Sequence, residues 1–226
     1  MQYQWDFAFL WRYAPLFWKG MGVTLAYTAG TISLGLIIGL LIGLGRLSRS
    51  RLLNIPLIAF IEVFRCTPLL VQIVWFYYAL PVLLGVQIPA TVAAVMTLSC
   101  YTGAFYAEIF RGGIVSIERG QWDAARALGL RPWAMMRRVI LPQAVRRMIP
   151  AFMERSIELM KTTTLVATIS YADLLYQANE LAQKTFRPLE VFTVTALIYF
   201  VVIFAASQLV HGLERRLAIS GEGMAR

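Results

Sequence analysis

The sequence MGVTLAYTAGTISLGLIIGLLIGLG, residues 21–45, runs for 25 positions without a charged side chain. About 20 apolar residues in an α-helix cover the ~30 Å hydrocarbon core of a bilayer. The segment is therefore predicted to be a transmembrane helix. Its glycines Gly35, Gly39 and Gly43 recur every four residues and share one helix face. Because small residues let two helices approach closely, we expect this face to pack against another transmembrane helix.

The composition of the whole chain also indicates a membrane protein. Of its 226 residues, 59% are hydrophobic and 15% are charged, against about 25% charged in soluble domains. A formal net charge of +9 would suggest nucleic-acid binding in a soluble protein. In a membrane protein, Lys and Arg in cytoplasmic loops account for it. The composition therefore predicts membrane lipid, and no nucleic acid, as a partner.

Further apolar segments divide the rest of the chain into spans. We predict one transmembrane domain, residues 1–226, and no soluble domain. Five transmembrane helices are expected, at residues 21–45, 52–80, 88–110, 148–171 and 190–212. The fourth is the weakest, because ERSIELMKTTT (154–164) places charges inside it, and a hydropathy window should score it as marginal.

The distribution of basic residues orients these helices. The connection at 46–51, the connection at 111–147 and the tail after Gly212 hold 14 of the 21 basic residues. With five spans, all three segments lie on one side of the membrane. Lys and Arg concentrate in cytoplasmic loops. The sequence therefore predicts an external N-terminus and a cytoplasmic C-terminus.

The longest cytoplasmic connection, about residues 112–144, is predicted to contain two short helices. Alanines favour a helix over about residues 121–128, and Gly129 follows where a C-cap belongs. A second helix is expected over about residues 133–140, ending near Pro142. The composition leaves two interpretations open: a loop whose arginines fix topology and touch lipid phosphates, or a docking element for a cytosolic protein.

The same loop resembles a known motif. The cytoplasmic signature of ABC importer permeases is Glu-Ala-Ala, three residues, Gly, nine residues, Ile, one residue and Leu-Pro. With the same spacing, this chain has Asp123-Ala124-Ala125, Gly129, Val139, Leu141 and Pro142. The flanks AEIFRGGIVSIERGQWDAA (107–125), ILPQAVRRMIP (140–150) and VFRCTPLLVQIVWFYYALP (63–81) extend the likeness. The chain is thus similar to permeases of the polar amino acid uptake family, of the histidine and glutamine permease type.

The resemblance implies a type I ABC importer permease fold in a prokaryotic inner membrane. It implies a second permease, identical or a sister chain, two cytosolic ATPase subunits and an extracytoplasmic solute-binding protein. An amino acid would enter by alternating access between two states. The signature loop would be the coupling helix that seats on the ATPase. The coupling positions carried over are Gly120, Asp123, Ala124, Ala125 and Gly129.

The sequence itself predicts a transport subunit rather than an enzyme. A phosphate-binding loop needs a lysine directly after a glycine. The three lysines follow Trp18, Met160 and Gln183. ATP and its Mg²⁺ are therefore expected on the partner ATPase, with no cofactor on this chain. The sequence also predicts no metal site and no catalytic nucleophile with its base.

Charged residues within the fourth span are the candidates for the substrate pathway. Glu154, Glu158 and Lys161 share a narrow helix face at i, i+4 and i+7. Counted from Pro150, Lys161 lies roughly 16 Å along the helix, near the bilayer midplane. A charge there should face water or a partner, and a zwitterionic amino acid offers both signs of charge. The predicted pathway residues are Thr67, Gln72, Glu154, Glu158, Lys161, Thr162 and Thr163.

Other interpretations of these charges remain open at this point. They could form a structural ion-pair cluster, or serve an ion-coupled secondary transporter or channel, or belong to a scaffold that transports nothing. Glu62 and Arg65 are expected to form a snorkelling pair or a gate. Glu108 is expected to be structural, and His211 to have no special role. The sequence does not identify the amino acid. It also does not show whether the partner permease is an identical copy or a sister chain.

Overall fold

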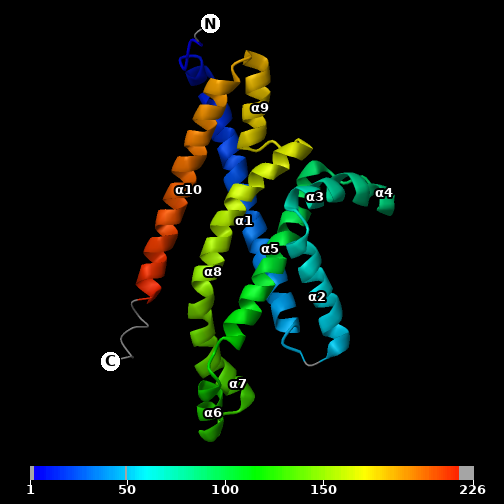
Figure 1. Ribbon diagram of the computed structural model, residues 1–226, viewed down its shortest axis with the longest axis vertical. Coiled ribbons are helices and arrows are strands. Elements are labelled where there is room, and N and C mark those ends of the chain that lie inside the picture. Colours follow the sequence, from blue (N-terminus) through cyan, green and yellow to red (C-terminus); the bar gives the residue numbers. More distant parts are fainter. Residues whose placement is uncertain (1–2, 49, 219–226) are drawn as a thin grey trace.

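The computed structural model describes residues 3–48 and 50–218, and every regular element among them is helical (Figure 1). The predicted all-α class is confirmed for these residues. The α-helices are α1 (Leu10–Gly45), α2 (Arg51–Cys66), α3 (Leu69–Val74), α4 (Leu80–Leu84), α5 (Ala90–Val115), α6 (Arg119–Ala127), α7 (Pro132–Met135), α8 (Leu141–Thr162), α9 (Leu174–Thr185) and α10 (Pro188–Ala218). Two π-helical turns, Trp75–Ala79 and Met136–Ile140, and a 3₁₀ segment, Thr163–Ile169, lie between them.

The glycine stripe of the first span packs against α5, as the sequence predicts. A Cβ atom added at Gly39 would lie 2.5 Å from the Cβ of Tyr106, and one at Gly35 would lie 2.6 Å from a Thr102 methyl group. Gly103 on α5 makes the corresponding close approach to α1, because a Cβ there would lie 2.5 Å from Ile38. These approaches admit only glycine without a shift, so the small residues set the α1–α5 distance.

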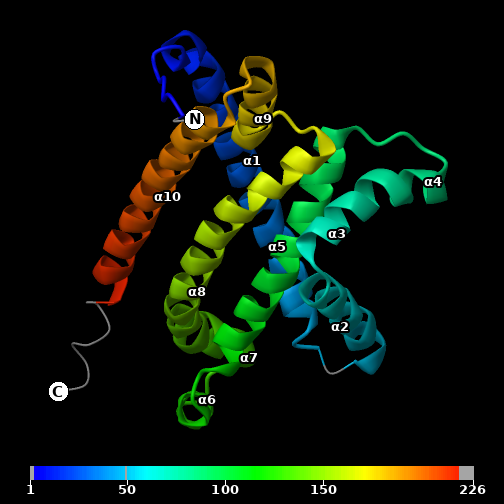
Figure 2. The ribbon, with the colours of Figure 1, turned by 45° about the horizontal axis from the view of Figure 1, so that its top comes forward.

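The second predicted span, 52–80, is broken rather than continuous. The chain bends by 109° between α2 and the α3–α4 segment, which projects away from the helix bundle (Figure 2). Pro68 disfavours a helical conformation in the residue before it, and Thr67 is extended, with φ −102° and ψ 137°. The side-chain amide of Gln72 donates to the carbonyls of Phe64 and Thr67, which the break leaves without helical partners.

The two helices expected on either side of Pro142 form one helical run. From Pro132 to Thr162 the chain passes through α7, a π-helical turn and α8 without a break. Pro142 lies just after the π-helical turn Met136–Ile140, where the regular α-helical hydrogen-bond pattern is already interrupted. The expected end near Pro142 and the expected start near Pro150 were therefore wrong. Pro150 lies inside α8, so a depth counted from it does not measure distance from the helix start.

Three described helices are long and apolar enough to cross a membrane: Leu10–Gly45, Ala90–Val115 and Pro188–Gly212. The bent pair α2 and α3–α4 makes a possible fourth. α8 does not pass this test, in keeping with its charged residues. The first helix begins at Leu10, well before the predicted residue 21, because Arg12 and Lys19 end the uncharged run without ending the helix.

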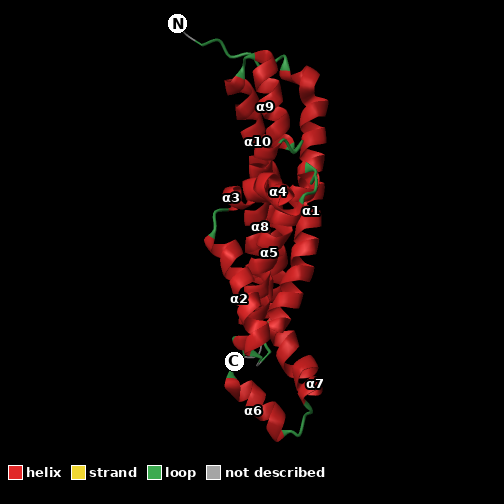
Figure 3. Cartoon of the chain, turned by 90° about the vertical axis from the view of Figure 1, so that its right-hand side faces the viewer, coloured by secondary structure: helices red, strands yellow, loops and turns green. Residues whose placement is uncertain are grey.

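The three basic segments lie toward one end of the molecule. The α1–α2 connection, the α6–α7 hairpin and the C-terminal end of α10 gather there (Figures 1 and 3). The N-terminus and α9 lie at the opposite end. α9 was not predicted, although Asp173 caps it by accepting from the Tyr176 N–H at 2.8 Å. Arg49 and Arg226, which belong to the basic segments, lie outside the described residues.

Candidate functional site

The α6 hairpin ends in a tight turn built on Gly129. Gly129 has a φ of +72°, a left-handed conformation that costs glycine nothing. Its N–H donates to the Arg126 carbonyl at 2.9 Å, and the Leu130 N–H donates to the Ala125 carbonyl at 3.2 Å. This pair of bonds defines a Schellman motif. The C-cap predicted at Gly129 is confirmed, and the predicted helix, about 121–128, overlaps α6.

The predicted coupling positions lie partly inside and partly outside this hairpin. Ala125 is buried against a cluster that includes Ile114, Ile117 and Met135. Gly120, Asp123, Ala124 and Gly129 are exposed, and Asp123 pairs with Arg126 at 3.0 Å. Two large apolar side chains, Leu128 and Trp133, are 79% and 73% exposed. Apolar residues exposed at the end of a protein mark a surface that another protein can cover.

The predicted charged face of α8 lines a cavity against α10. Glu154, Glu158 and Lys161 contribute to it from α8, and Ser207 and His211 contribute from α10. The cavity has a volume of about 490 Å³; we call it the α8–α10 cavity. The structure therefore brings together the three charged residues that the sequence singled out, and it adds His211, for which no role was expected.

A second cavity, of about 360 Å³, lies on the other side of the same two glutamates. We call it the α5–α8 cavity. Its charged and aromatic lining consists of Arg65, Phe105, Glu108, Glu154, Arg155 and Glu158. The Arg155 guanidinium lies 3.3 Å from the centre of the Phe105 ring and forms an ion pair with Glu158. Arg65 also lies over Phe105, at 5.5 Å.

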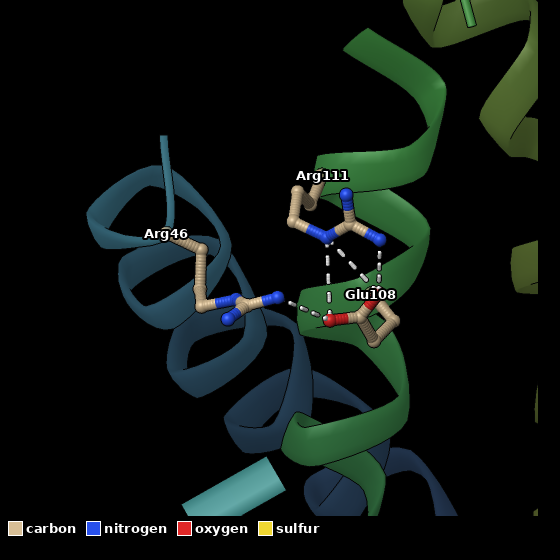
Figure 4. A network of polar contacts seen from close by, with 3 residues as sticks. All are labelled: Arg46, Glu108 and Arg111. Atoms are coloured by element: carbon tan, nitrogen blue, oxygen red, sulfur yellow. Dashed lines mark hydrogen bonds and ion pairs between the residues drawn. The ribbon is translucent and has the colours of Figure 1, made fainter. Parts of the chain in front are cut away.

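An ion-pair network joins α1 and α5 where α1 ends (Figure 4). Glu108 of α5 binds Arg111, with an oxygen–nitrogen distance of 2.6 Å, and lies 3.4 Å from Arg46 at the end of α1. All three side chains are half-buried. Because one carboxylate joins the two helices, the expected structural role of Glu108 agrees with its contacts.

The remaining predicted pathway residues lie outside the residues that line the two cavities. Gln72 is buried and binds the backbone at the α2–α3 break, beside Thr67. The hydroxyls of Thr162 and Thr163 donate to carbonyls one turn earlier, those of Leu159 and Met160. In this conformation these four residues shape the backbone near the charged face. Their predicted role in transport stays a prediction.

The sequence did not reveal the position of Arg65. Glu62 accepts a hydrogen bond from the Cys66 thiol at 3.3 Å, and no Glu62–Arg65 ion pair is present within the described residues; a snorkelling or gating role for the two stays a prediction. The signal that could have located Arg65 is Pro68. Because Pro68 disfavours a helical Thr67, α2 ends at Cys66, and Arg65 lies in the last turn of this helix.

Three helices long and apolar enough to cross a membrane, together with a bent helix pair, indicate an integral membrane protein. The sequence matches the family described as "Binding-protein-dependent transport system inner membrane component" over residues 35–219. The chain belongs to this family. The resemblance drawn from the signature loop is confirmed.

Individual relatives cover almost the whole chain. The glutamine transport system permease protein GlnP of Escherichia coli (strain K12) is 38% identical over 96% of this chain and 99% of its own. The glutamate/aspartate import permease protein GltK of Escherichia coli O157:H7 is 33% identical over 96% of this chain and 100% of its own. A crystal structure of an amino acid ABC transporter with histidines superposes with a TM-score of 0.90 at 37% identity, covering 95% of this chain and 100% of that one. The inward-facing MetNI methionine transporter, 22% identical with a TM-score of 0.75, shares the fold.

Proposed function

We propose that this chain is the membrane-spanning permease subunit of an ATP-driven importer that brings a polar or charged amino acid into the cytoplasm. The observation that carries the proposal is the combination of an exposed α6 hairpin at the basic end with a charged α8 face deeper in the bundle. Relatives named for glutamine and for glutamate/aspartate transport support amino acids as the substrate class. ATP and Mg²⁺ are bound by a separate ATPase.

The proposed topology has five spans, with α8 and the 3₁₀ segment as the fourth. The N-terminus is external and the C-terminus is cytoplasmic, because the basic connections gather at one end of the bundle. The chain lies in a prokaryotic inner membrane. α8 carries charge into the bilayer, which is tolerated where a helix faces a cavity or a partner rather than lipid. A second permease, identical or a sister chain, supplies that partner.

The proposed coupling runs through α6. Each of two ATPases receives one hairpin, with Asp123, Ala124 and Gly129 at the contact and Ala125 holding the hairpin to the permease. Closure of the ATPases on ATP favours the outward-open state, and an external solute-binding protein delivers the substrate. Hydrolysis returns the pathway to the inward-open state. ATP shifts the equilibrium between the outward-open and inward-open states only because it binds the two states with different affinities.

Along the proposed pathway the substrate meets Glu154, Glu158 and Lys161. An ion-coupled secondary transporter that uses these same charges is the competing function. The membership of this chain in a family of binding-protein-dependent components disfavours it, since such systems couple transport to a partner.

Reconstitution tests the proposal. Proteoliposomes would contain this chain, its ATPase and the solute-binding protein. ATP trapped inside should drive uptake of a radiolabelled amino acid, and an uncoupler that dissipates the ion gradients should leave uptake unchanged. Uptake that persists without ATP, or that collapses with the ion gradient, would establish the secondary transporter instead.

A further inference from the structure

An apolar groove follows the first turns of α1, at the end of the molecule opposite the basic segments (Figure 1). α1 lines it from Leu10 to Met21, and α10 contributes Val194 and Ile198; we call it the α1–α10 groove. Its volume is about 290 Å³, and every side chain that lines it is aromatic or apolar. At 1.5 Å per helical residue, the α1 wall from Leu10 to Met21 is about 16 Å long.

The dimensions of the groove match one leaflet of a bilayer. Val194 and Ile198 belong to Pro188–Gly212, one of the helices long and apolar enough to cross a membrane. They lie about 9 and 15 Å along this helix from Pro188. Half of a ~30 Å hydrocarbon core is about 15 Å. The groove therefore lies at the level of one leaflet and is as long as an acyl chain of that leaflet.

Two tryptophans form the exposed rim of the groove. Trp11 and Trp18 line it, and they are nevertheless 84% and 76% exposed. Because they are seven residues apart, they share one face of α1. Tryptophan is enriched where a membrane meets water, since its ring is apolar and its N–H is polar. The rim indicates that the groove opens toward lipid at the membrane surface.

Each of these tryptophans is followed directly by a cation, Arg12 and Lys19. Successive helical positions are about 100° apart, so the two cations share the face next to the rim and lie about 10 Å apart along the helix. Both side chains are exposed, and neither forms an ion pair within the described part of the chain. The surface beside the groove thus carries two uncompensated positive charges.

The other two cations among the described residues at this end are compensated. Lys184 pairs with Glu180 at 3.5 Å, and Arg187 pairs with Glu190 at 3.0 Å. A cation at the level of a leaflet is stable only beside water or a partner. The phosphate of a lipid is the anion that a membrane surface offers to such a cation.

We infer that the first turns of α1 bind an anionic phospholipid, with one acyl chain in the α1–α10 groove and the phosphate between Arg12 and Lys19. The inference goes beyond the proposed function, from which it takes only the assignment of this end to the outer leaflet. The glycerol of the lipid crosses the tryptophan rim, which lies between the groove and the cations. Lys19 lies deeper than Arg12, and its flexible stem lets the ammonium reach up to the phosphate.

The charge of this surface selects among lipids. A phosphatidylcholine headgroup brings its own cation, so it leaves part of the positive charge of Arg12 and Lys19 without compensation. A phosphatidylglycerol headgroup carries a net negative charge and has no cation. The groove does not distinguish the two, because their acyl chains are the same. Affinity from the groove and preference from the cations are therefore separable.

Native mass spectrometry of the detergent-purified complex of permease and ATPase tests this inference. The probes are dioleoyl phosphatidylglycerol and dioleoyl phosphatidylcholine. One variant combines Arg12→Gln and Lys19→Gln, and a second, Ala14→Phe, fills the groove that Ala14 lines. Lys184→Gln is the control, since it removes a cation of the same end that is already paired. Thermal unfolding of each variant shows whether it is folded.

The wild-type complex should bind phosphatidylglycerol about ten- to a hundredfold more tightly than phosphatidylcholine, the worth of one hydrogen bond to a charged group. The double variant should lose this preference and keep its affinity for phosphatidylcholine. Ala14→Phe should weaken the binding of both lipids, because it blocks the chain that they share. Lys184→Gln should change neither affinity.

Three results would overturn the inference. They are equal affinities of the wild type for the two lipids, a preference that survives in the double variant, and unchanged affinities in folded Ala14→Phe. A solute-binding protein that docks on this surface is the competing occupant. In that case the double variant should weaken binding of that protein to nanodiscs made of phosphatidylcholine alone, and this result also overturns the inference. Failure of the proposed function would leave the lipid affinities unaffected, because they do not depend on uptake.

Discussion

Gly39→Ala tests whether the glycine stripe sets the distance between α1 and α5. The added methyl carbon would lie 2.5 Å from the Cβ of Tyr106 and 3.0 Å from the Ala107 nitrogen. Ordinary van der Waals contact begins at about 3.4 Å, so α1 and α5 would have to separate by about 1 Å. Tyr106 cannot yield easily, because it is fully buried and its hydroxyl is hydrogen-bonded to Ser156 at 2.7 Å.

The expected cost follows from this clash. Overpacking a close contact costs about 1–3 kcal/mol, while alanine gains up to about 1 kcal/mol over glycine from helix propensity. Gly30→Ala on the same helix is a matched control, because a Cβ there meets nothing within 4 Å. The difference between the two variants cancels the propensity gain and leaves the steric cost of about 1–3 kcal/mol.

Thermal unfolding of the detergent-solubilised permease measures this difference. For a chain of this size, 1 kcal/mol corresponds to about 2–4 °C in Tm. Gly39→Ala should therefore unfold about 2–12 °C below Gly30→Ala. Equal Tm values for the two variants would refute the argument that close backbone approach at Gly39 holds α1 against α5.

Three further changes give distinct outcomes. Glu108→Gln removes the carboxylate shared by Arg46 and Arg111, and should lower stability by about 1–3 kcal/mol in thermal unfolding; an unchanged Tm would contradict the structural role of the network. Gly129→Ala places a Cβ on a left-handed residue at a cost of about 1–2 kcal/mol, so it should reduce stimulation of the ATPase by the permease. Gly120→Ala, where a Cβ meets open space, should not; equal effects of the two variants would contradict a role for the Gly129 turn in coupling. Burial raises the pKa of Asp173 from 3.8 to about 6, so the charged carboxylate destabilises the folded state once the pH rises through that range. Asp173→Asn should therefore increase the free energy of unfolding at pH 8 by up to about 3 kcal/mol, and raise the Tm, but should do neither at pH 4. An equal gain at both pH values would contradict burial as the cause.

Local rules predicted the parts of the fold that depend on neighbouring residues. The glycine stripe of the first span and the Gly129 C-cap follow from spacing and backbone conformation, and both are confirmed. The α2–α3 break has a local cause in Pro68, and Gln72 donates to the carbonyls of Phe64 and Thr67 at the 109° bend. The sequence pattern alone does not choose between a kink and a full turn.

The positions of the charged side chains were harder to predict because they depend on contacts between distant segments. The i, i+4, i+7 spacing placed Glu154, Glu158 and Lys161 on one face correctly. It could not show that Arg155 would turn to the Phe105 ring on α5. Nor could it show that Arg65, ninety residues earlier in the chain, lies over the same ring. Such pairings require the packing of α2, α5 and α8, which helical periodicity does not specify.

The unbroken helix from Pro132 to Thr162 links the two parts of the proposed site. Because helical residues rise 1.5 Å each, this run is about 45 Å long. The hairpin of α6 is attached to its start through the buried cluster around Ala125, and Glu154 and Lys161 lie near its other end. A packed helix moves as a rigid element, and bends concentrate at π-helical turns and prolines. Here those positions are Met136–Ile140 and Pro150. In the proposed coupling, a displacement of α6 would reach the charged face along this helical run, with bending concentrated at these two positions.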